Sequence, residues 1–165
     1  MRRFAITFAA VAIALFAAEL TPVGQAWVVE PWTTSIAELS VAIAKLFDPN
    51  VAASGVTLYS TANGFSVTIL AGCNGLEAMI VLFAGIVAYP APWKHRIAGI
   101  AIGTLAIQAL NLVRIVSLFY IGQWSQAVFD WAHLYGWQVL IMLDVLIVWL
   151  LWLRTIPRKH LAAAA

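Results

Sequence analysis

The fold class is decided by residues 97–121, which read IAGIAIGTLAIQALNLVRIVSLFYI. Arg114 is the only charged residue in this run. At about 1.5 Å of rise per residue, such a helix is long enough to cross the ~30 Å hydrocarbon core of a bilayer. The 165-residue chain is 64% hydrophobic and 10% charged, whereas a typical soluble domain is about 25% charged. The sequence therefore predicts an integral membrane protein built as a single domain.

Three further apolar segments, at residues 4–20, 73–90 and 134–154, have a similar character. Together with residues 97–121 they predict an all-α membrane protein with about four transmembrane helices. The first segment is either a retained anchor or a signal peptide. The bulky Phe16 lies where a cleavage site needs a small residue, which favours the anchor.

The segment at residues 21–72 is less hydrophobic and contains prolines and glycines, so we expect it outside the membrane. It contains apolar residues at helical spacing, which predict an amphipathic helix on the membrane or on the bundle. An Asn63-Gly64 step flanked by alternating apolar residues predicts a β-hairpin. The residues that define the helix are Ile36, Leu39, Ile43, Leu46 and Phe47.

Seven of the nine lysines and arginines lie on one side of this four-helix path. The positive-inside rule makes that side the cytoplasm, with both termini there, and the loop at 122–136 on the outside. The basic residues on the cytoplasmic side are Arg2, Arg3, Lys94, Arg96, Arg154, Arg158 and Lys159.

Three reactive side chains come from three separate segments yet map to the same depth. Cys73 is expected at the outer end of one membrane segment, and His133 just before the last one. Arg114 lies about 27 Å along its helix from Arg96, also near the outer surface. A charge inside a membrane segment is costly and normally has a partner and a function. We therefore predict that Cys73, Arg114 and His133 form a catalytic site on the outer side of the membrane.

The sequence Gly72-Cys73-Asn74-Gly75 permits a sharp turn from a strand into a helix. A thiol at a helix N-terminus beside a cation has a lowered pKa, which favours the reactive thiolate. Arg114 could supply this cation or bind an oxyanion, and His133 could transfer the proton.

Other polar residues lie at spacings that would support this site. Asn111 and Ser117 share a helical face with Arg114, and Glu77 lies one turn after Cys73, where it could pair with Arg114. Asp130 could orient His133 if that stretch is helical. The supporting set is Asn74, Glu77, Asn111, Ser117 and Asp130. The roles of Glu19 and Asp144 stay open.

Each member of the predicted site also has a plain structural interpretation. A lone cysteine in a membrane segment is usually a packing residue, an interfacial histidine is common, and an arginine can extend to the headgroups. One cysteine excludes an intramolecular disulfide framework. The chain shows neither a metal-ligand cluster nor a basic stripe for nucleic acid, so we expect no cofactor, no metal and no nucleic-acid partner.

The order Gly72-Cys73-Asn74-Gly75, then Asn111-Leu112-Val113-Arg114-Ile115, then His133 resembles the exosortase/archaeosortase family. The short chain is most similar to exosortase H. The resemblance covers about residues 70–150. It departs from the family at Gly72-Cys73-Asn74-Gly75, where many members have Ala-Cys-Ser-Gly. Many members are also about twice as long.

The resemblance implies a cysteine protease-transpeptidase that sorts cargo proteins, placed in the bacterial inner membrane with its site facing the periplasm. Such cargo ends in a short motif, a transmembrane helix and a basic tail. By the same resemblance Cys73 is the nucleophile, Arg114 its anion partner and His133 the acid/base. Two alternatives stay open: a membrane acyltransferase that loads an acyl group on Cys73, and a non-enzymatic assembly subunit or cargo receptor. The cargo, the acceptor nucleophile and the oligomeric state are not fixed by the sequence.

Overall fold

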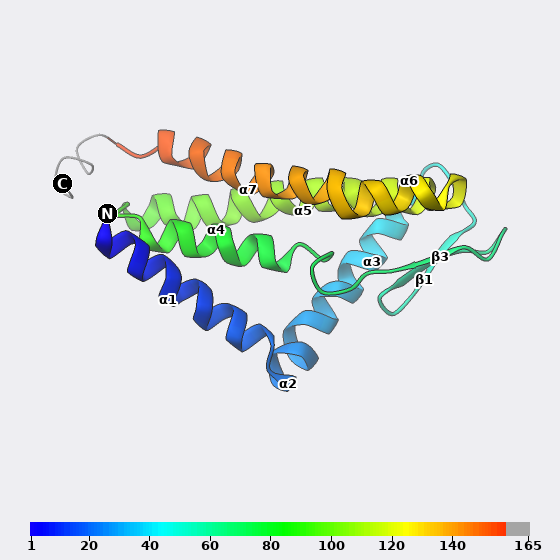
Figure 1. The fold of residues 1–165 in the computed structure, drawn as a ribbon, viewed down its shortest axis with the longest axis horizontal. Helices are drawn as coiled ribbons and strands as arrows, with labels where there is room; N and C mark the ends of the chain where they lie inside the picture. The colour runs from blue at the N-terminus through cyan, green and yellow to red at the C-terminus, as the bar shows by residue number, and fades with distance from the viewer. Residues whose placement is uncertain (158–165) are drawn as a thin grey trace.

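The computed structural model describes residues 1–157, so Arg158 and Lys159 lie outside the described residues. Helices occupy most of this range, and a small sheet lies at one end (Figure 1). The helices are α1 (Arg2–Glu19), α2 (Pro22–Gly24), η1 (Gln25–Val29), α3 (Glu30–Ala44), α4 (Leu76–Ala88), α5 (Trp93–Trp124), α6 (Gln126–Trp131), η2 (Ala132–Gly136) and α7 (Trp137–Arg154).

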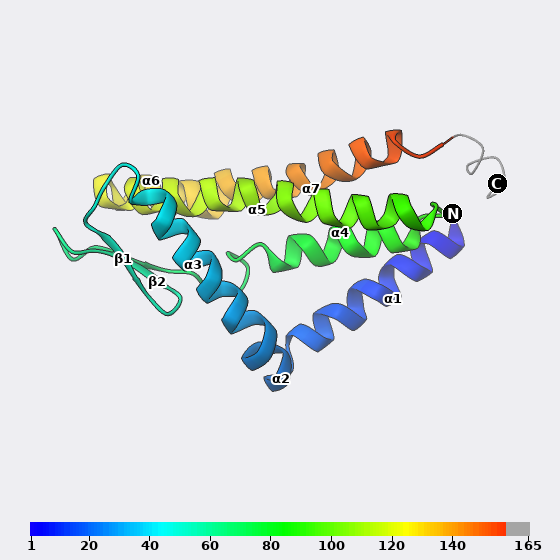
Figure 2. The ribbon, with the colours of Figure 1, turned by 180° about the vertical axis from the view of Figure 1, so that it is seen from behind.

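Two long helical segments lie side by side and give the molecule its length (Figures 1 and 2). The first is α5, with 32 residues. The second runs through α6, η2 and α7 from Gln126 to Arg154, with 29 residues. Ser125 separates them in an extended conformation, and its hydroxyl accepts the N–H of Val128 in the first turn of α6. The outer loop predicted before the last helix is therefore mostly helical.

Helix length and composition support fewer membrane crossings than the sequence predicts. Two segments, Trp93–Trp124 and Gln126–Arg154, are long and apolar enough to cross a membrane. A third crossing follows only if α1 and Pro22–Ala44, bent by 73°, count as one span. α4 has 13 residues, which is only about 20 Å at 1.5 Å per residue. The protein is an integral membrane protein, but four separate spans remain a prediction.

The sheet is antiparallel, with the strand order β1-β2-β3. The strands are β1 (Val51–Ser54), β2 (Thr57–Ser60) and β3 (Ser66–Thr68). β2 and β3 form the hairpin predicted around Asn63-Gly64, with Leu58 opposite Val67. Gly64 has a φ of 75°, which side chains other than glycine rarely adopt. β1, which pairs with β2, was not predicted from the sequence.

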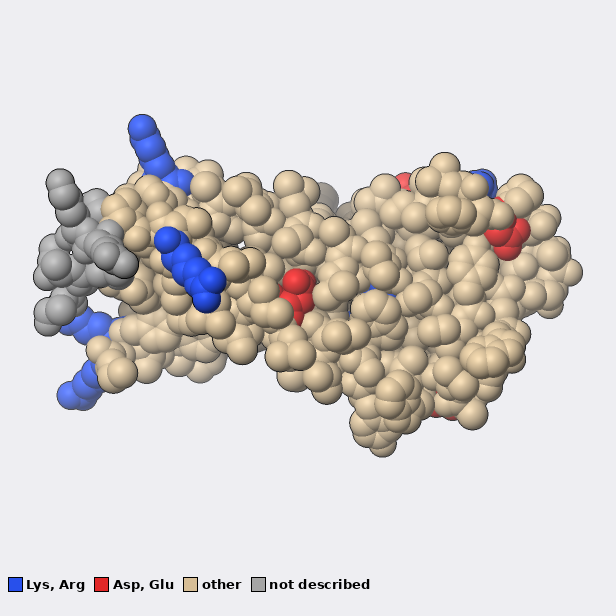
Figure 3. Space-filling view, turned by 90° about the horizontal axis from the view of Figure 1, so that it is seen from above, with Lys and Arg blue, Asp and Glu red and all other residues tan. Residues whose placement is uncertain are grey.

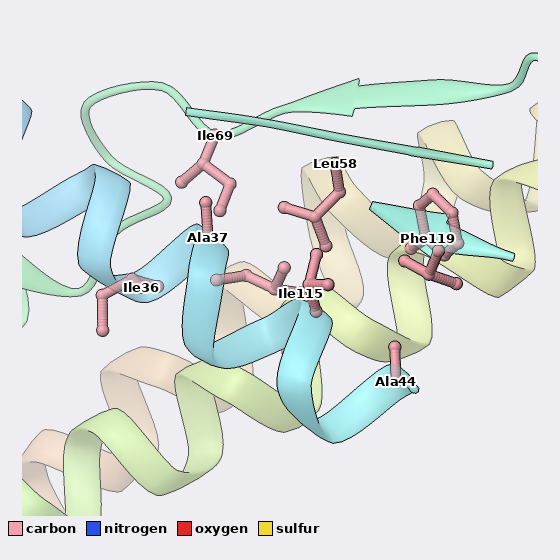
Figure 4. Packing of buried hydrophobic residues seen from close by; sticks show 9 residues of the cluster. Ile36, Ala37, Ala44, Leu58, Ile69, Ile115 and Phe119 are labelled. Carbon is pink, nitrogen blue, oxygen red and sulfur yellow. The ribbon is translucent and has the colours of Figure 1, made fainter. Parts of the chain in front are cut away.

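One hydrophobic core joins α3, the sheet and α5 (Figure 4). Leu58 from the sheet and Phe119 from α5 are fully buried in it. The predicted amphipathic face of α3 is partly wrong, because Leu39 is largely exposed whereas Ala37 and Ala44 are fully buried. Small residues on this face let α3 pack closely against its neighbours, and the core fixes where the loop after β3 leaves the sheet.

A second core lies at the other end and joins α4, α5 and α7, and α1 packs against α4 beside it. In Figures 1 and 2, α1 diverges from α7 along its length toward α2. Lysine and arginine atoms gather mainly at the end where the chain begins and α7 ends (Figure 3). This distribution agrees with the one-sided charge pattern of the sequence.

Candidate active site

The loop between β3 and α4 carries Cys73 and is shaped by two glycines. Gly72 and Gly75 have φ values of 85° and 77°, so both adopt the left-handed backbone conformation expected for the strand-to-helix turn. The N–H of Cys73 donates to the carbonyl of Leu70 at 2.9 Å. The N–H of Gly72 donates to the carboxylate of Glu77, in the first turn of α4. The loop is therefore held from both of its ends.

Asn74 ties this loop to the rest of the protein and is fully buried. Its amide Nδ2 donates to Thr33 Oγ1 at 3.0 Å, and its Oδ1 accepts the N–H of Leu76 at 2.9 Å. Its backbone carbonyl accepts from Trp32 Nε1 and from Gln108 Nε2, at 3.2 and 3.3 Å. Buried polar groups that are fully bonded hold a unique geometry. Asn74 thus fixes the cysteine loop against α3 and α5.

The predicted trio meets at the sulfur of Cys73. His133 Nε2 lies 3.3 Å from Cys73 Sγ. Arg114 donates from Nη2 to the same sulfur at 3.4 Å and from Nη1 to the carbonyl of Gly72 at 3.4 Å. Arg114 and His133, which lie 41 and 60 residues beyond Cys73 in the sequence, therefore converge on its sulfur atom.

Arg114 is the most deeply buried of these three side chains, with 3% of its surface exposed. Within residues 1–157 no carboxylate lies at salt-bridge distance from its guanidinium, and the predicted pair with Glu77 is absent there. A buried cation without an anion is costly. The site is therefore ready to stabilise a negative charge that forms on the sulfur or next to it.

His133 is placed by the π-helical turn η2. Its ring stacks on Phe129, with the ring centroids 5.5 Å apart. Asp130 does not orient the imidazole, because its carboxylate accepts from Gln126 at 2.9 Å. The sequence analysis missed Phe129, although it lies four residues before His133 and hence on the same helical face.

The remaining supporting residues lie behind the trio rather than in it. Asn111 donates to Gln108 Oε1 at 3.4 Å, and Gln108 in turn binds the Asn74 carbonyl. The hydroxyl of Ser117 donates to the backbone carbonyl of Arg114 at 2.9 Å, not to its guanidinium. These contacts brace α5 and the loop without touching the sulfur.

The pKa of the Cys73 thiol is raised, whereas the sequence analysis expected it to be lowered. Burial is the largest cause, the charge of Arg114 opposes it, and the charge of Glu77 adds to the rise in pKa. Desolvation disfavours the charged form of any acid, and here it outweighs the cation. The resting site is therefore a neutral thiol beside an imidazole, so the thiol needs a base when it reacts.

This pKa shift predicts the pH dependence of thiol alkylation. Iodoacetamide reacts with the thiolate, so at pH 7 Cys73 should react more slowly than an exposed cysteine, whose pKa is about 8.5. Its rate should keep rising at higher pH than for the exposed thiol. Glu77→Gln removes a negative charge and should shift the rate profile to lower pH. The rates are measured by stopping the iodoacetamide reaction at intervals and quantifying alkylated Cys73 by mass spectrometry. An alkylation rate that levels off below pH 8 would contradict the prediction.

A second prediction concerns Gly75, because side chains of α5 occupy the space that a side chain at this position would need. A Cβ at this position would lie 2.6 Å from Gln108 Nε2 and 3.2 Å from Asn111 Nδ2. Gly75→Ala should therefore lower the thermal unfolding midpoint more than Gly64→Ala. Gly64 shares the left-handed conformation, which costs about 1–2 kcal/mol in other residues, but it has open space around it. Equal midpoints for the two variants, measured in detergent, would show that the loop does not pack against α5.

Among residues 1–157 no group of three or more metal-binding side chains is assembled. The geometry instead defines a membrane protein with a cysteine, histidine and arginine site next to a helix start. The family model described as transmembrane exosortase matches residues 1–152. The chain belongs to the transmembrane exosortase family, which confirms the resemblance seen in the sequence. No curated protein and no solved structure matches the chain.

Proposed function

We propose that this protein is a cysteine protease-transpeptidase that cleaves cargo proteins carrying a C-terminal sorting signal. The family supports a role in sorting such cargo. The observation that carries the chemistry is the position of Cys73 Sγ, 3.3 Å from His133 Nε2 and 3.4 Å from Arg114 Nη2. A thiol with a base on one side and a cation on the other suits nucleophilic attack on a carbonyl.

The proposed reaction has two halves. His133 takes the thiol proton while Cys73 Sγ attacks the carbonyl carbon of the scissile peptide bond, and Arg114 stabilises the resulting negative charge. The carbon–nitrogen bond then breaks, His133 returns the proton to the leaving amine, and the membrane tail departs. The cargo remains on Cys73 as a thioester. An amine or water attacks this thioester, forms the new amide or acid, and regenerates the thiol.

We also propose the membrane arrangement in which this reaction runs. The helices α1, α4, α5 and α7 cross the bacterial inner membrane with both termini in the cytoplasm. The sheet, α3 and the site then lie on the periplasmic side. The basic residues at the starts of α1 and α5 and the end of α7 support this orientation, because positive charge favours the cytoplasmic side.

The thioester is the intermediate to capture. In the test, the protein is co-expressed with candidate cargo proteins. Each of these ends in a segment of about 20 apolar residues followed by a basic tail. Rapid acid denaturation and mass spectrometry should find a cargo fragment on the peptide that contains Cys73, and Cys73→Ala should show none. A fatty acyl group in its place would favour an acyltransferase. If neither adduct forms and Cys73→Ala still supports cleavage, the proposed function is wrong.

A further inference from the structure

A groove runs along the helix bundle from the candidate active site toward the end of the molecule that holds the N-terminus. It has a volume of about 700 Å³, and its walls come from α1, α4 and α7. Gly72 and Arg114 lie at one end of it. At the other end Phe4 and Trp149 close it, with ring centroids 6.1 Å apart. The groove therefore reaches the residues around Cys73 Sγ at one of its two ends only.

The polarity of the groove changes along its length. Its polar lining residues, Glu77, Arg114 and Gln138, come from the first turn of α4, the buried part of α5 and the start of α7. The rest of the lining is apolar. This pattern complements a segment that is polar where it meets Cys73 and apolar beyond that point.

The lining residues repeat at helical spacing on every wall. On α1 they are Phe4 and Phe8, four residues apart, and on α7 they include Met142 and Leu146, also four apart. On α4 the lining residues Ala78, Val81 and Leu82 follow at spacings of three and four, whereas Gly85 beyond them packs against the indole of Trp149. Apolar ridges at this spacing, with the small Ala78 beside them, are the kind of surface that another helix packs against in a membrane.

The dimensions fit a helix seated by one side. From Gln138 to Trp149 the groove extends about 16 Å along α7, at about 1.5 Å per residue. A helix of this length and about 10–12 Å in diameter fills roughly 1,300–1,800 Å³. The groove volume of about 700 Å³ is smaller than that. A seated helix would therefore leave its other side to the lipid.

We infer that this groove binds the transmembrane helix of the cargo's sorting signal, with the outer three turns between α1, α4 and α7 and the preceding peptide bond next to Cys73. The inference rests on the proposed function for the identity of the occupant. The inference specifies where the cargo helix lies and that its outer turns contact the groove. The inner turns of the helix leave the groove at the aromatic residues Phe4 and Trp149.

Disulfide cross-linking tests the position without any chemistry at Cys73. The full chain carries Cys73→Ala together with Met142→Cys, which lines the groove and is 63% exposed. The matched control carries Leu143→Cys, the next residue on α7, which is 46% exposed and lies outside the lining set. The probe is a synthetic helix of leucine and alanine with three C-terminal arginines and one cysteine, placed in turn along its outer turns. Protein and probe are reconstituted together in vesicles of phosphatidylethanolamine and phosphatidylglycerol.

Met142→Cys should cross-link at least about tenfold more than Leu143→Cys, at probe positions three or four residues apart. Equal cross-linking of both variants, a pattern without this repeat, or no cross-linking would overturn the inference. Because Cys73 is absent, none of these results depends on whether the protein is a protease.

A pair of filling variants tests the same groove during the reaction. Val81 and Phe83 are both 37% exposed on α4, but only Val81 lines this groove, whereas Phe83 lines a different one. Val81→Trp should reduce cargo cleavage at least about tenfold and leave the rate of Cys73 alkylation unchanged, because it blocks the helix and not the thiol. Phe83→Trp should leave both unchanged. Cleavage at the native rate by Val81→Trp would overturn the inference while leaving the proposed function standing.

Discussion

Arg114→Gln should lower the rate of cargo cleavage by about a thousandfold or more. Removal of one donor to a developing oxyanion costs about 10²–10³ in rate. Here the same guanidinium also stabilises the thiolate, since it lies 3.4 Å from Cys73 Sγ. Its charge opposes the rise that burial causes in the thiol pKa. The variant should therefore be slower in alkylation as well as in cleavage. The measurements are the fraction of tailed cargo processed with time and the alkylation rate at pH 8.

Two further variants separate the donor geometry of Arg114 from its position on α5. Arg114→Lys keeps the charge but loses the planar fork that reaches both Cys73 Sγ and the Gly72 carbonyl, so it should not restore cleavage. Ser117→Ala removes only a hydroxyl bonded to the Arg114 backbone and should retain nearly native rates. If Arg114→Gln keeps more than about a tenth of the native rate, Arg114 does not stabilise charge in the reaction, because the lost donor alone should cost more.

The convergence of Cys73, Arg114 and His133 could be predicted from the sequence because helix rise fixes depth. Counting residues along an apolar helix places a side chain along the membrane normal without any knowledge of packing. Three segments whose reactive residues share one depth can therefore be matched, and the structure brings all three to the sulfur. The hairpin was predictable for a similar reason, since the Asn63-Gly64 turn is local.

The support of the site could not be predicted, because it depends on contacts between distant parts of the chain. Asn74 bonds to Thr33, which lies 41 residues away on α3. No spacing rule connects these positions. The strand β1 was missed because Val51–Ser54 has little apolar alternation and is defined by its partner β2. The face of α3 was misassigned because the alanines buried there have no strong hydrophobic signal.

The direction of the Cys73 pKa shift could not be predicted from the sequence for the same reason. Its position near a helix start and a cation predicts a lowered value, and both features are present in the fold. Its degree of burial is a property of the assembled core, against which Cys73 packs. Desolvation depends on that assembly and is the largest cause of the shift. In the proposed reaction the thiol therefore depends on a base during attack, and His133 is the residue in position to supply it.

His133→Ala should lower cargo cleavage by about 10²–10⁴, the usual contribution of a general acid-base group. The raised pKa of Cys73 leaves a neutral thiol at pH 7, so without the imidazole only hydroxide can remove its proton. The residual rate of the variant should therefore rise with pH across the range where the native rate is level. The departing amine also loses its proton donor, so the thioester should form more slowly than in the native protein. Cleavage measured from pH 6 to pH 9 gives both the loss and its pH dependence.

Asp130→Asn is the matched control for His133→Ala, because it changes the charge three residues away on the same helical segment. Its carboxylate bonds to Gln126 and does not hold the imidazole, so this variant should cleave cargo at nearly the native rate. Phe129→Ala should cost activity instead, because the ring that stacks on His133 is lost while the base itself remains. A large loss from Asp130→Asn would mean that the carboxylate reaches His133 during the reaction. Native rates from His133→Ala at every pH would show that the thiol does not depend on this imidazole, and that Cys73 reacts by another route.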